Sequence, residues 1–150
     1  MKVGGKVMFL GEFYHNLDEK NRLIVPSRFR EMLNGEFIIT RGMEQCLFAF
    51  PMEEWEVIER KLRALPFTKK DIRAFTRFFF SSATEAICDK QGRVLIPPLL
   101  KEYAHLKKEC VLIGVSNRFE IWDKTNWIHY MKESEETLNE LAEELIDFNL

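Results

Sequence analysis

The stretch "LDEKNRLIVPSRFREML" (residues 17–33) has a second copy in the same chain, "CDKQGRVLIPPLLKEYA" (residues 88–104). Laid one on the other without a gap, the copies share an aspartate, an arginine four residues later, and a proline that ends a hydrophobic run. In the first copy these residues are Asp18, Arg22 and Pro26. The match bears directly on the fold, because it divides the chain into two halves of like construction.

Each copy encodes a tight turn followed by a strand and a short helix. The fourth turn residue is Asn21 in one copy and Gly92 in the other, and these residue types adopt positive φ most readily. The aspartate that opens each turn can accept hydrogen bonds from backbone N–H groups two residues on. Since the proline after each strand suits the start of a helix, we expect short helices over 27–33 and 98–106.

The similarity continues beyond one inserted residue. The stretch "EFIITRGMEQCLFAFPMEEW" (residues 36–55) aligns with "KECVLIGVSNRFEIWDKTNW" (residues 108–127). Both indicate a strand, a glycine-containing loop, a strand and a helix, opened by Pro51 in one and capped by Asp123 in the other. A solenoid needs about three repeats. Two copies therefore predict an α+β fold in which strands from both halves complete one pseudo-dimeric barrel or sandwich.

The segments that join and follow the repeats are predicted to be helical. Apolar residues recur at helical spacing over 52–64 and 69–79, and Pro66 breaks the pattern between them, which predicts a helical hairpin. From Trp127 onward, apolar residues alternate at three- and four-residue spacing, as in a heptad seam. This C-terminal helix packs either on the protein's own body or on a neighbouring subunit. We also expect strands before the turns, over 7–17 and 78–88, and an exposed aromatic stretch over 75–80.

Composition argues against several classes of protein. With 46% hydrophobic and 13% aromatic residues among 150, the chain is typical of one globular domain or of two halves sharing a core. No apolar run reaches the roughly 18 residues of a membrane span, so we expect a cytoplasmic protein with no membrane partner. The cysteines Cys46, Cys88 and Cys110 lack C-x-x-C spacing and are predicted to be buried thiols. The three histidines stand far apart, so no metal or cofactor is expected.

Charge is distributed unevenly along the chain, although the formal net charge is only −2. Among the last twenty residues one lysine stands against seven carboxylates, so the rest of the chain is net positive. A basic run lies in the middle of the chain and consists of Arg60, Lys61, Arg63, Lys69, Lys70, Arg73 and Arg77. A basic body with an acidic tail is compatible with a nucleic-acid partner but does not require one.

The duplicated D-x-x-x-R turn, with "MFLGEF" (residues 8–13) and "RFFFSSATE" (residues 77–85), resembles the MraZ family of bacterial transcription regulators, which contain two SpoVT-AbrB-like units. The resemblance implies a swapped-hairpin, AbrB-like β-barrel built by both halves. It also implies a ring-like homo-oligomer that binds double-stranded DNA at direct repeats in its own promoter, upstream of a division and cell-wall operon. The implied location is the cytoplasm, in association with the nucleoid.

The resemblance also implies a division of the chain into units. The first SpoVT-AbrB-like unit, with its connector helix, covers 8–65, and a linking helix covers 66–79. The second unit, with the C-terminal helix, covers 80–150. Residues 1–7 form an extension before the family's usual start, which makes Met8 a candidate for the true first residue.

The two turns contain the residues predicted to bind DNA. Arginine presents a planar fork that fits guanine edges, lysine supplies point charges to phosphates, and an aspartate four residues away can orient the guanidinium. The predicted DNA-binding residues are Asp18, Lys20, Asn21 and Arg22 in the first copy and Asp89, Lys90, Gln91 and Arg93 in the second. The simpler alternative is a surface salt bridge without a ligand, worth about 0–1 kcal/mol.

Other functions fit the sequence less well. Two symmetry-related aspartates resemble the aspartic protease dyad, but a charged residue follows each one here, and the nearby arginine would keep each carboxylate ionised. Glycine-rich phosphate loops, Ser-His-Asp ordering and H-E-x-x-H are absent from the sequence, so we expect neither catalysis nor a small-molecule substrate. An antitoxin-like AbrB regulator usually has one copy and a disordered tail. The remaining alternative is a DNA-independent oligomeric interaction protein acting through its acidic C-terminal helix.

Overall fold

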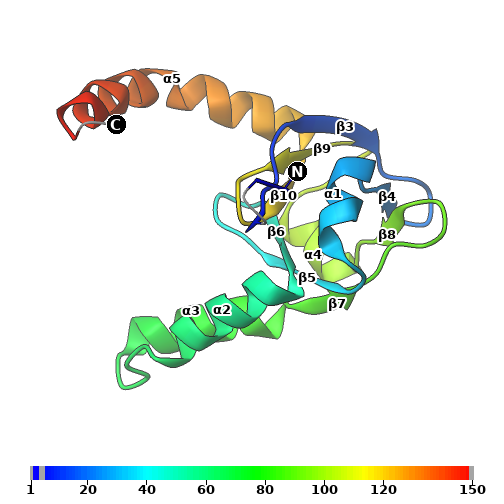
Figure 1. Ribbon diagram of the computed structural model, residues 1–150, viewed down its shortest axis with the longest axis horizontal. Helices are drawn as coiled ribbons and strands as arrows, with labels where there is room; N and C mark the ends of the chain where they lie inside the picture. The colour runs from blue at the N-terminus through cyan, green and yellow to red at the C-terminus, as the bar shows by residue number, and fades with distance from the viewer. Residues whose placement is uncertain (1, 4–5, 149–150) are drawn as a thin grey trace.

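The computed structural model describes residues 2–3 and 6–148 (Figure 1). A short hairpin of β1 (Lys2–Val3) and β2 (Lys6–Val7) precedes the two repeats. The first repeat contains β3 (Glu12–Asn16), β4 (Arg22–Ile24), α1 (Ser27–Leu33), β5 (Phe37–Arg41), β6 (Leu47–Pro51) and α2 (Met52–Arg63). After α3 (Lys70–Ser81), the second contains β7 (Thr84–Ala86), β8 (Arg93–Leu95), α4 (Pro98–Tyr103), β9 (Glu109–Gly114), β10 (Phe119–Asp123) and α5 (Lys124–Asp147). The predicted α+β fold with two internal repeats is confirmed.

The repeats exchange strands. A six-stranded antiparallel sheet has the order β3-β9-β10-β6-β5-β7. Its outer strand β3 belongs to the first repeat but pairs with β9 of the second, with Glu12 opposite Ile113. In the same way β7 of the second repeat pairs with β5 of the first, with Phe37 opposite Ala86. Each half is therefore completed by the other, and the two halves share one sheet.

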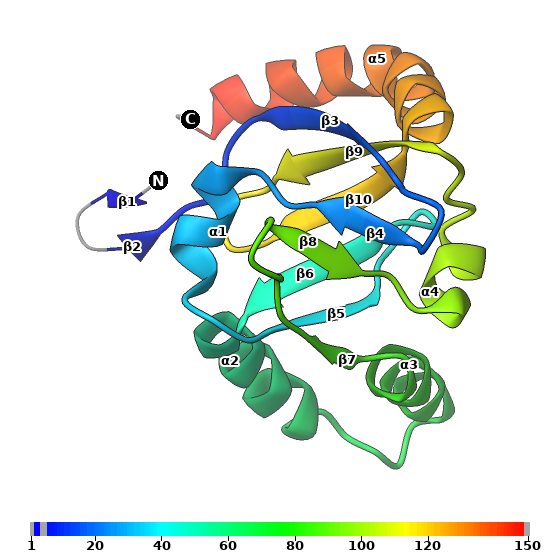
Figure 2. The same ribbon diagram turned by 90° about the vertical axis from the view of Figure 1, so that its right-hand side faces the viewer.

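A two-stranded ribbon, β4 paired with β8, covers this sheet. Figure 2 shows the ribbon in front of the sheet, between α1 and α4. Leu23 and Val94 point inward from the ribbon into one apolar cluster with Phe29 and Phe119, whose rings stack with centroids 5.0 Å apart. Burying each such large side chain contributes about 1.5–3 kcal/mol. Within the described residues, hydrogen bonds do not join ribbon and sheet into one closed sheet, so a closed barrel stays a prediction.

Several element boundaries differ from the sequence-based expectation. The strand expected over 7–17 is limited to β3 (Glu12–Asn16) and the end of β2, with Gly11 at a φ of 101° between them. Helix α4 ends at Tyr103 rather than at residue 106, because His105 adopts a left-handed φ of 52°. The expected strand over 78–88 is wrong at its start, since α3 continues to Ser81 and only Thr84–Ala86 is a strand. Helix α3 extends through the aromatic residues of this stretch, because their side chains pack at helical spacing rather than alternating as in a strand.

The aromatic stretch 75–80 is covered rather than exposed. Phe79 is buried and stacks on Trp55 of α2, with ring centroids 5.5 Å apart, while the other phenylalanines of the stretch are half-buried. Figure 1 shows α2 and α3 side by side as a hairpin that projects from the body. The predicted helical hairpin is confirmed, and α3 also packs on the body, since Phe79 contacts Phe50 of β6 and Phe78 contacts Tyr103 of α4.

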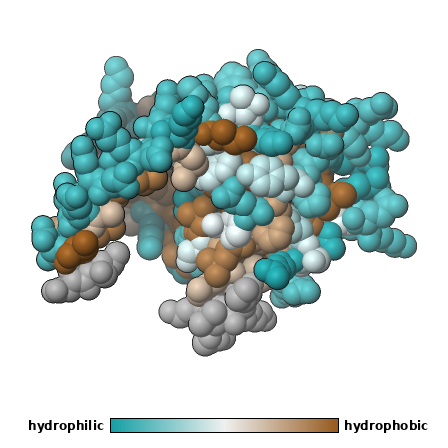
Figure 3. All heavy atoms as spheres, turned by 90° about the horizontal axis from the view of Figure 1, so that it is seen from above, coloured by the Kyte–Doolittle hydropathy of each residue, from teal (hydrophilic) through white to brown (hydrophobic). Residues whose placement is uncertain are grey.

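Helix α5 leaves the body soon after it begins. Asp123 caps it by accepting a hydrogen bond from the backbone N–H of Asn126 at 3.1 Å. Trp127 and Tyr130 pack on Trp122, but most of the following side chains are exposed. Figure 3 shows hydrophobic side chains along one side of this projecting helix. Its exposed large apolar side chains are Ile128, Met131, Leu138, Leu141, Ile146 and Phe148, of which Met131, Leu138 and Leu141 form an apolar seam at heptad spacing.

The distal part of α5 thus does not pack on the protein's own body. Of the two expected kinds of packing, packing on that body is found only for the first turns of the helix. Helix α5 is 24 residues long, but its many carboxylates make it too polar for a membrane span. No helix in the described part of the chain is both long and apolar enough to span a bilayer.

Candidate nucleic-acid interface

The first turn is held by its aspartate. The carboxylate Oδ1 of Asp18 accepts hydrogen bonds from the backbone N–H groups of Lys20 and Arg22, both at 2.9 Å. Its Oδ2 accepts a bond from Nε of Arg22 at 2.8 Å. Asn21 closes the turn with φ 61°. The aspartate therefore fixes both the backbone of the turn and the direction of the arginine side chain.

The second turn repeats this arrangement. Oδ1 of Asp89 accepts bonds from the backbone N–H groups of Gln91 and Arg93 at 2.9 Å, and Oδ2 accepts a bond from Nε of Arg93 at 2.9 Å. Gly92 has φ 78°, at the position that Asn21 occupies in the first turn. Two different sequences thus give the same hydrogen-bond pattern around an aspartate and an arginine.

Both aspartates are held in the ionised form. The backbone N–H of Arg22, followed by its guanidinium and the N–H of Lys20, keeps the pKa of Asp18 below its usual range. The equivalent groups, led by the backbone N–H of Arg93, lower the pKa of Asp89. Hydrogen bonds to a carboxylate favour its charged form, so each arginine keeps an anionic partner at neutral pH.

The ribbon joins the two turns rigidly. In its register Arg22 lies opposite Leu95, and Ile24 lies opposite Arg93. The ends of the turns are bonded across the repeats as well, since the carbonyl of Gly92 accepts a bond from Val25 at 2.9 Å. The carbonyl of Asn21 accepts the equivalent bond from Ile96 at 2.8 Å. The two arginines therefore have fixed positions on one small surface.

A basic side chain from the opposite repeat supports each turn. Nζ of Lys101, on α4, donates to Oδ1 of Asn21 at 2.9 Å. Arg30, on α1, lies against Gly92, where a Cβ would overlap its guanidinium, and its Nη1 donates to the carbonyl of Val25 at 2.8 Å. The lack of a side chain at Gly92 thus makes room for the arginine that supports the second turn.

Sequence reasoning missed a basic groove beside the first turn. This hollow of about 590 Å³ is lined in part by Lys101, Lys107 and Lys108, together with Asp18 and other residues of the turn. The pair of adjacent lysines before β9 was the available signal, but only the fold brings them to the turn. The groove gives the first turn more positive charge to offer a phosphate backbone than its own residues supply.

Some predicted site residues present their side chains to solvent at the tips of the turns, whereas others hold the turns in shape. Lys20 and Lys90 are exposed at the tips of the turns, where they are available to a ligand. Gln91 is also exposed and supports its turn through its backbone N–H. The structure groups the eight predicted residues into two sets of four, at the two turns that lead into the paired strands of the ribbon.

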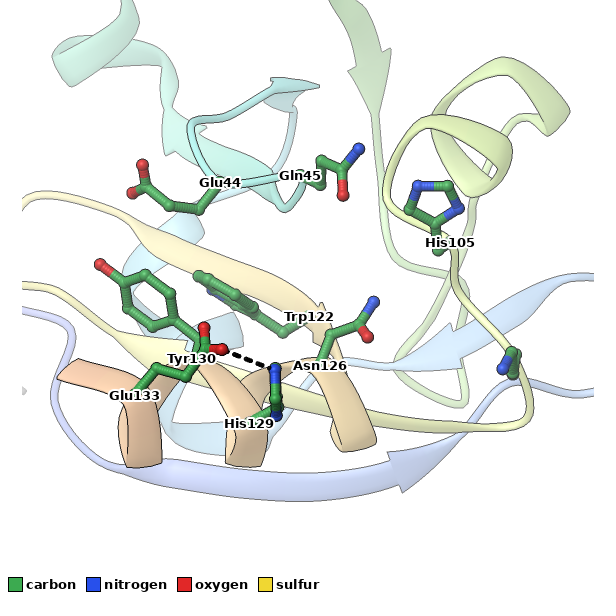
Figure 4. Close-up of a pocket in the computed structure, with 9 residues that line it drawn as sticks. Glu44, Gln45, His105, Trp122, Asn126, His129, Tyr130 and Glu133 are labelled. Carbon is green, nitrogen blue, oxygen red and sulfur yellow. Dashed lines mark ion pairs between the residues drawn. The ribbon is translucent and has the colours of Figure 1, made fainter. Parts of the chain in front are cut away.

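A second hollow lies away from the turns, between α5 and the β5–β6 loop (Figure 4). It is about 450 Å³ and polar at its rim, where His129 pairs with Glu133 at 3.0 Å. Trp122 and Tyr130 form part of its wall. None of the eight predicted site residues lines it, although Lys107 lines both this hollow and the groove beside the first turn.

Metal and thiol chemistry find no support in the described residues. No group of three histidine, cysteine or acidic side chains in that part of the chain is placed to hold a metal ion. Cys46 and Cys110 are buried as expected, whereas Cys88 is half-buried. Burial raises the pKa of Cys110 to about 12, which keeps it a neutral thiol.

Comparison with protein families agrees with this two-repeat geometry. One family model, described as "MraZ protein, putative antitoxin-like", matches the chain twice, over residues 8–78 and over residues 79–149. The family is a regulator-like family rather than an enzyme family. The two matches together span nearly the whole chain, and each contains one of the aspartate-arginine turns. The chain therefore belongs to the MraZ family and contains two of its units.

Proposed function

We propose that this protein is a sequence-specific DNA-binding transcriptional regulator. It binds repeated sites upstream of its own division and cell-wall operon through its two D-x-x-x-R turns, and it is associated with the nucleoid in the cytoplasm. The observation that supports this most strongly is the pair of identically bonded arginines, Arg22 and Arg93, at the ends of one exposed ribbon. A salt bridge needed only for stability would not have to recur with the same bonds on one face.

The bonding leaves each arginine able to bind a base. In both turns the aspartate is bonded through Nε of the arginine. Among residues 8–148, the Nη groups of Arg22 and Arg93 have no hydrogen-bond partner, so their outer fork is available for the O6 and N7 atoms of a guanine. An oriented guanidinium loses less rotational freedom on binding than a free one.

Assembly into a homo-oligomer strengthens this binding. Two turns reach few phosphates, which supports only weak non-specific binding of about 10⁻⁴ to 10⁻⁶ M at physiological salt. Linked copies in a ring would make each further contact effectively intramolecular and raise avidity by about 10²- to 10⁴-fold. The exposed seam of α5, including Leu138 and Leu141, is a surface suited to such contacts.

The test is footprinting with purified protein on the DNA upstream of its own gene. The expected result is a protected series of short, evenly spaced direct repeats, with affinity that falls steeply as salt is raised. The matched variant Arg22→Ala should lose this protection while keeping the wild-type circular dichroism spectrum. Uniform, sequence-independent coating of the DNA by both proteins would contradict the proposal.

A second function is favoured by one specific observation. The apolar seam of α5 is exposed and surrounded by carboxylates, which suits a protein partner as well as another subunit. In that case the protein would be a DNA-independent oligomeric interaction protein. Pull-down of a partner that is unaffected by nuclease treatment, together with no footprint, would favour this function over DNA binding.

A further inference from the structure

The outward face of the ribbon contains two large apolar side chains beside the two arginines. Ile24 is 39% exposed and Leu95 is 60% exposed, although both belong to short hydrophobic runs. Their neighbours Leu23 and Val94 are buried, because successive side chains of a strand point to opposite faces. The exposed pair is therefore fixed outward by the same alternation that fills the core.

The register places these four side chains in an alternating square. Arg22 is opposite Leu95, and Ile24 is opposite Arg93. Charged and apolar groups thus alternate along each strand and across the ribbon. In Figure 2 this ribbon faces the viewer as the outermost layer on its side of the molecule. No side chain of the described chain covers the apolar pair enough to bury it.

The dimensions of the square fit the major groove of B-form DNA. Paired strands lie about 4.8 Å apart, so a two-stranded ribbon enters a groove about 12 Å wide. Residues two apart on one strand are separated by about 7 Å, which is close to two base-pair steps. An arginine that reaches a guanine from one corner therefore places its apolar neighbour against a base about two steps away.

From this arrangement we infer that Ile24 and Leu95 read thymines in the major groove through contacts with the C5 methyl groups. The C5 methyl is the apolar feature that a base pair displays in that groove. Each flanking arginine is bonded to its aspartate through Nε, which leaves its Nη donors available to base edges, and this favours DNA over a second protein surface as the occupant. The inference rests on the proposed function and adds a class of bases to the sites that the arginines recognise.

The test replaces thymine by deoxyuracil throughout the upstream DNA fragment. This removes the methyl groups and leaves base pairing unchanged. Taking a methyl-sized group out of water is worth about fourfold in affinity, so wild-type protein should bind the uracil fragment about 4- to 15-fold more weakly. The variant Ile24→Thr/Leu95→Thr should bind thymine DNA more weakly and distinguish the two fragments by less than about twofold.

The control variant is Leu65→Thr, which removes an apolar side chain of similar exposure, 37%, between α2 and α3. It should retain the full preference for thymine. Equal binding of both fragments by wild-type protein, at any affinity, would overturn the inference and leave the proposed function standing. An equal loss on uracil DNA by wild type and double variant would also overturn it, since DNA shape would then be responsible.

Two further outcomes would contradict the inference. If neither fragment were bound at low salt, the proposed function would fail together with the inference. If Ile24→Thr/Leu95→Thr lowered the mass in solution measured by light scattering, the apolar pair would belong to a contact between copies of the chain. An unchanged mass, combined with the loss of thymine preference, supports the reading of methyl groups.

Discussion

Replacing Gly92 by alanine should destabilise the protein strongly, although the equivalent position in the first repeat has a side chain. An alanine at the observed φ of 78° costs about 1–2 kcal/mol. The added Cβ also displaces the guanidinium of Arg30, which gives up its 2.8 Å bond to the carbonyl of Val25. A hydrogen bond from a charged group is worth about 1.5–3 kcal/mol. The expected loss in the free energy of unfolding is therefore about 2.5–5 kcal/mol.

The measurement is urea unfolding followed by circular dichroism, at one protein concentration for all variants. Asn21→Gly is the matched control and should change stability by no more than about 1 kcal/mol, because relief of the left-handed backbone offsets the lost bond from Lys101. In an Arg30→Ala background, Gly92→Ala should cost only the backbone contribution of about 1–2 kcal/mol. An equal cost of Gly92→Ala in both backgrounds would refute the role assigned to Arg30.

Four further predictions concern binding, assembly and pH. Arg22→Ala should weaken specific DNA binding by about 1–3 kcal/mol, measured by fluorescence anisotropy, and should lower the free energy of unfolding by no more than about 1 kcal/mol. Lys107→Ala/Lys108→Ala should lower the slope of log affinity against log salt by roughly two without altering sequence preference, and an unchanged slope would remove the groove from the interface. Leu138→Asp should reduce the mass in solution measured by light scattering, whereas wild-type mass would show that the α5 seam is not a subunit contact. Because the folded-state pKa of Asp18 is lowered from 3.8, its stabilising contribution is present above that value and is lost only as pH falls through the lowered pKa, which carboxyl NMR titration can check.

Local chemistry explains why the turns could be predicted from sequence. Asp18 bonds to residues two and four positions away, and Asn21 needs only its own backbone conformation, so all the necessary information lies within five residues. The duplicated spacing then identified the second turn at Asp89. The helical hairpin was predictable for a similar reason, since its periodicity and its breaking proline are adjacent in sequence.

Features that depend on distant pairing could not be predicted in this way. The contact between Lys101 and Asn21 joins residues from different repeats, and nothing near either residue specifies it. The exposure of Ile24 was also hidden, because a short run of branched apolar residues looks buried until the register of the ribbon is known. The end of α4 shifted because His105 takes a left-handed conformation that its residue type does not demand.

Because the repeats exchange strands, the distance between the two binding turns does not depend on the linker between the repeats. In a chain of independent modules, the linker sets how far apart two binding loops stand. Here the distance between the turns is a property of the β4–β8 register and the shared sheet. The covalent connection runs elsewhere, through the projecting α2–α3 hairpin. Insertions and deletions at the tip of that hairpin can therefore accumulate in related chains while the spacing of bases recognised by one subunit stays constant.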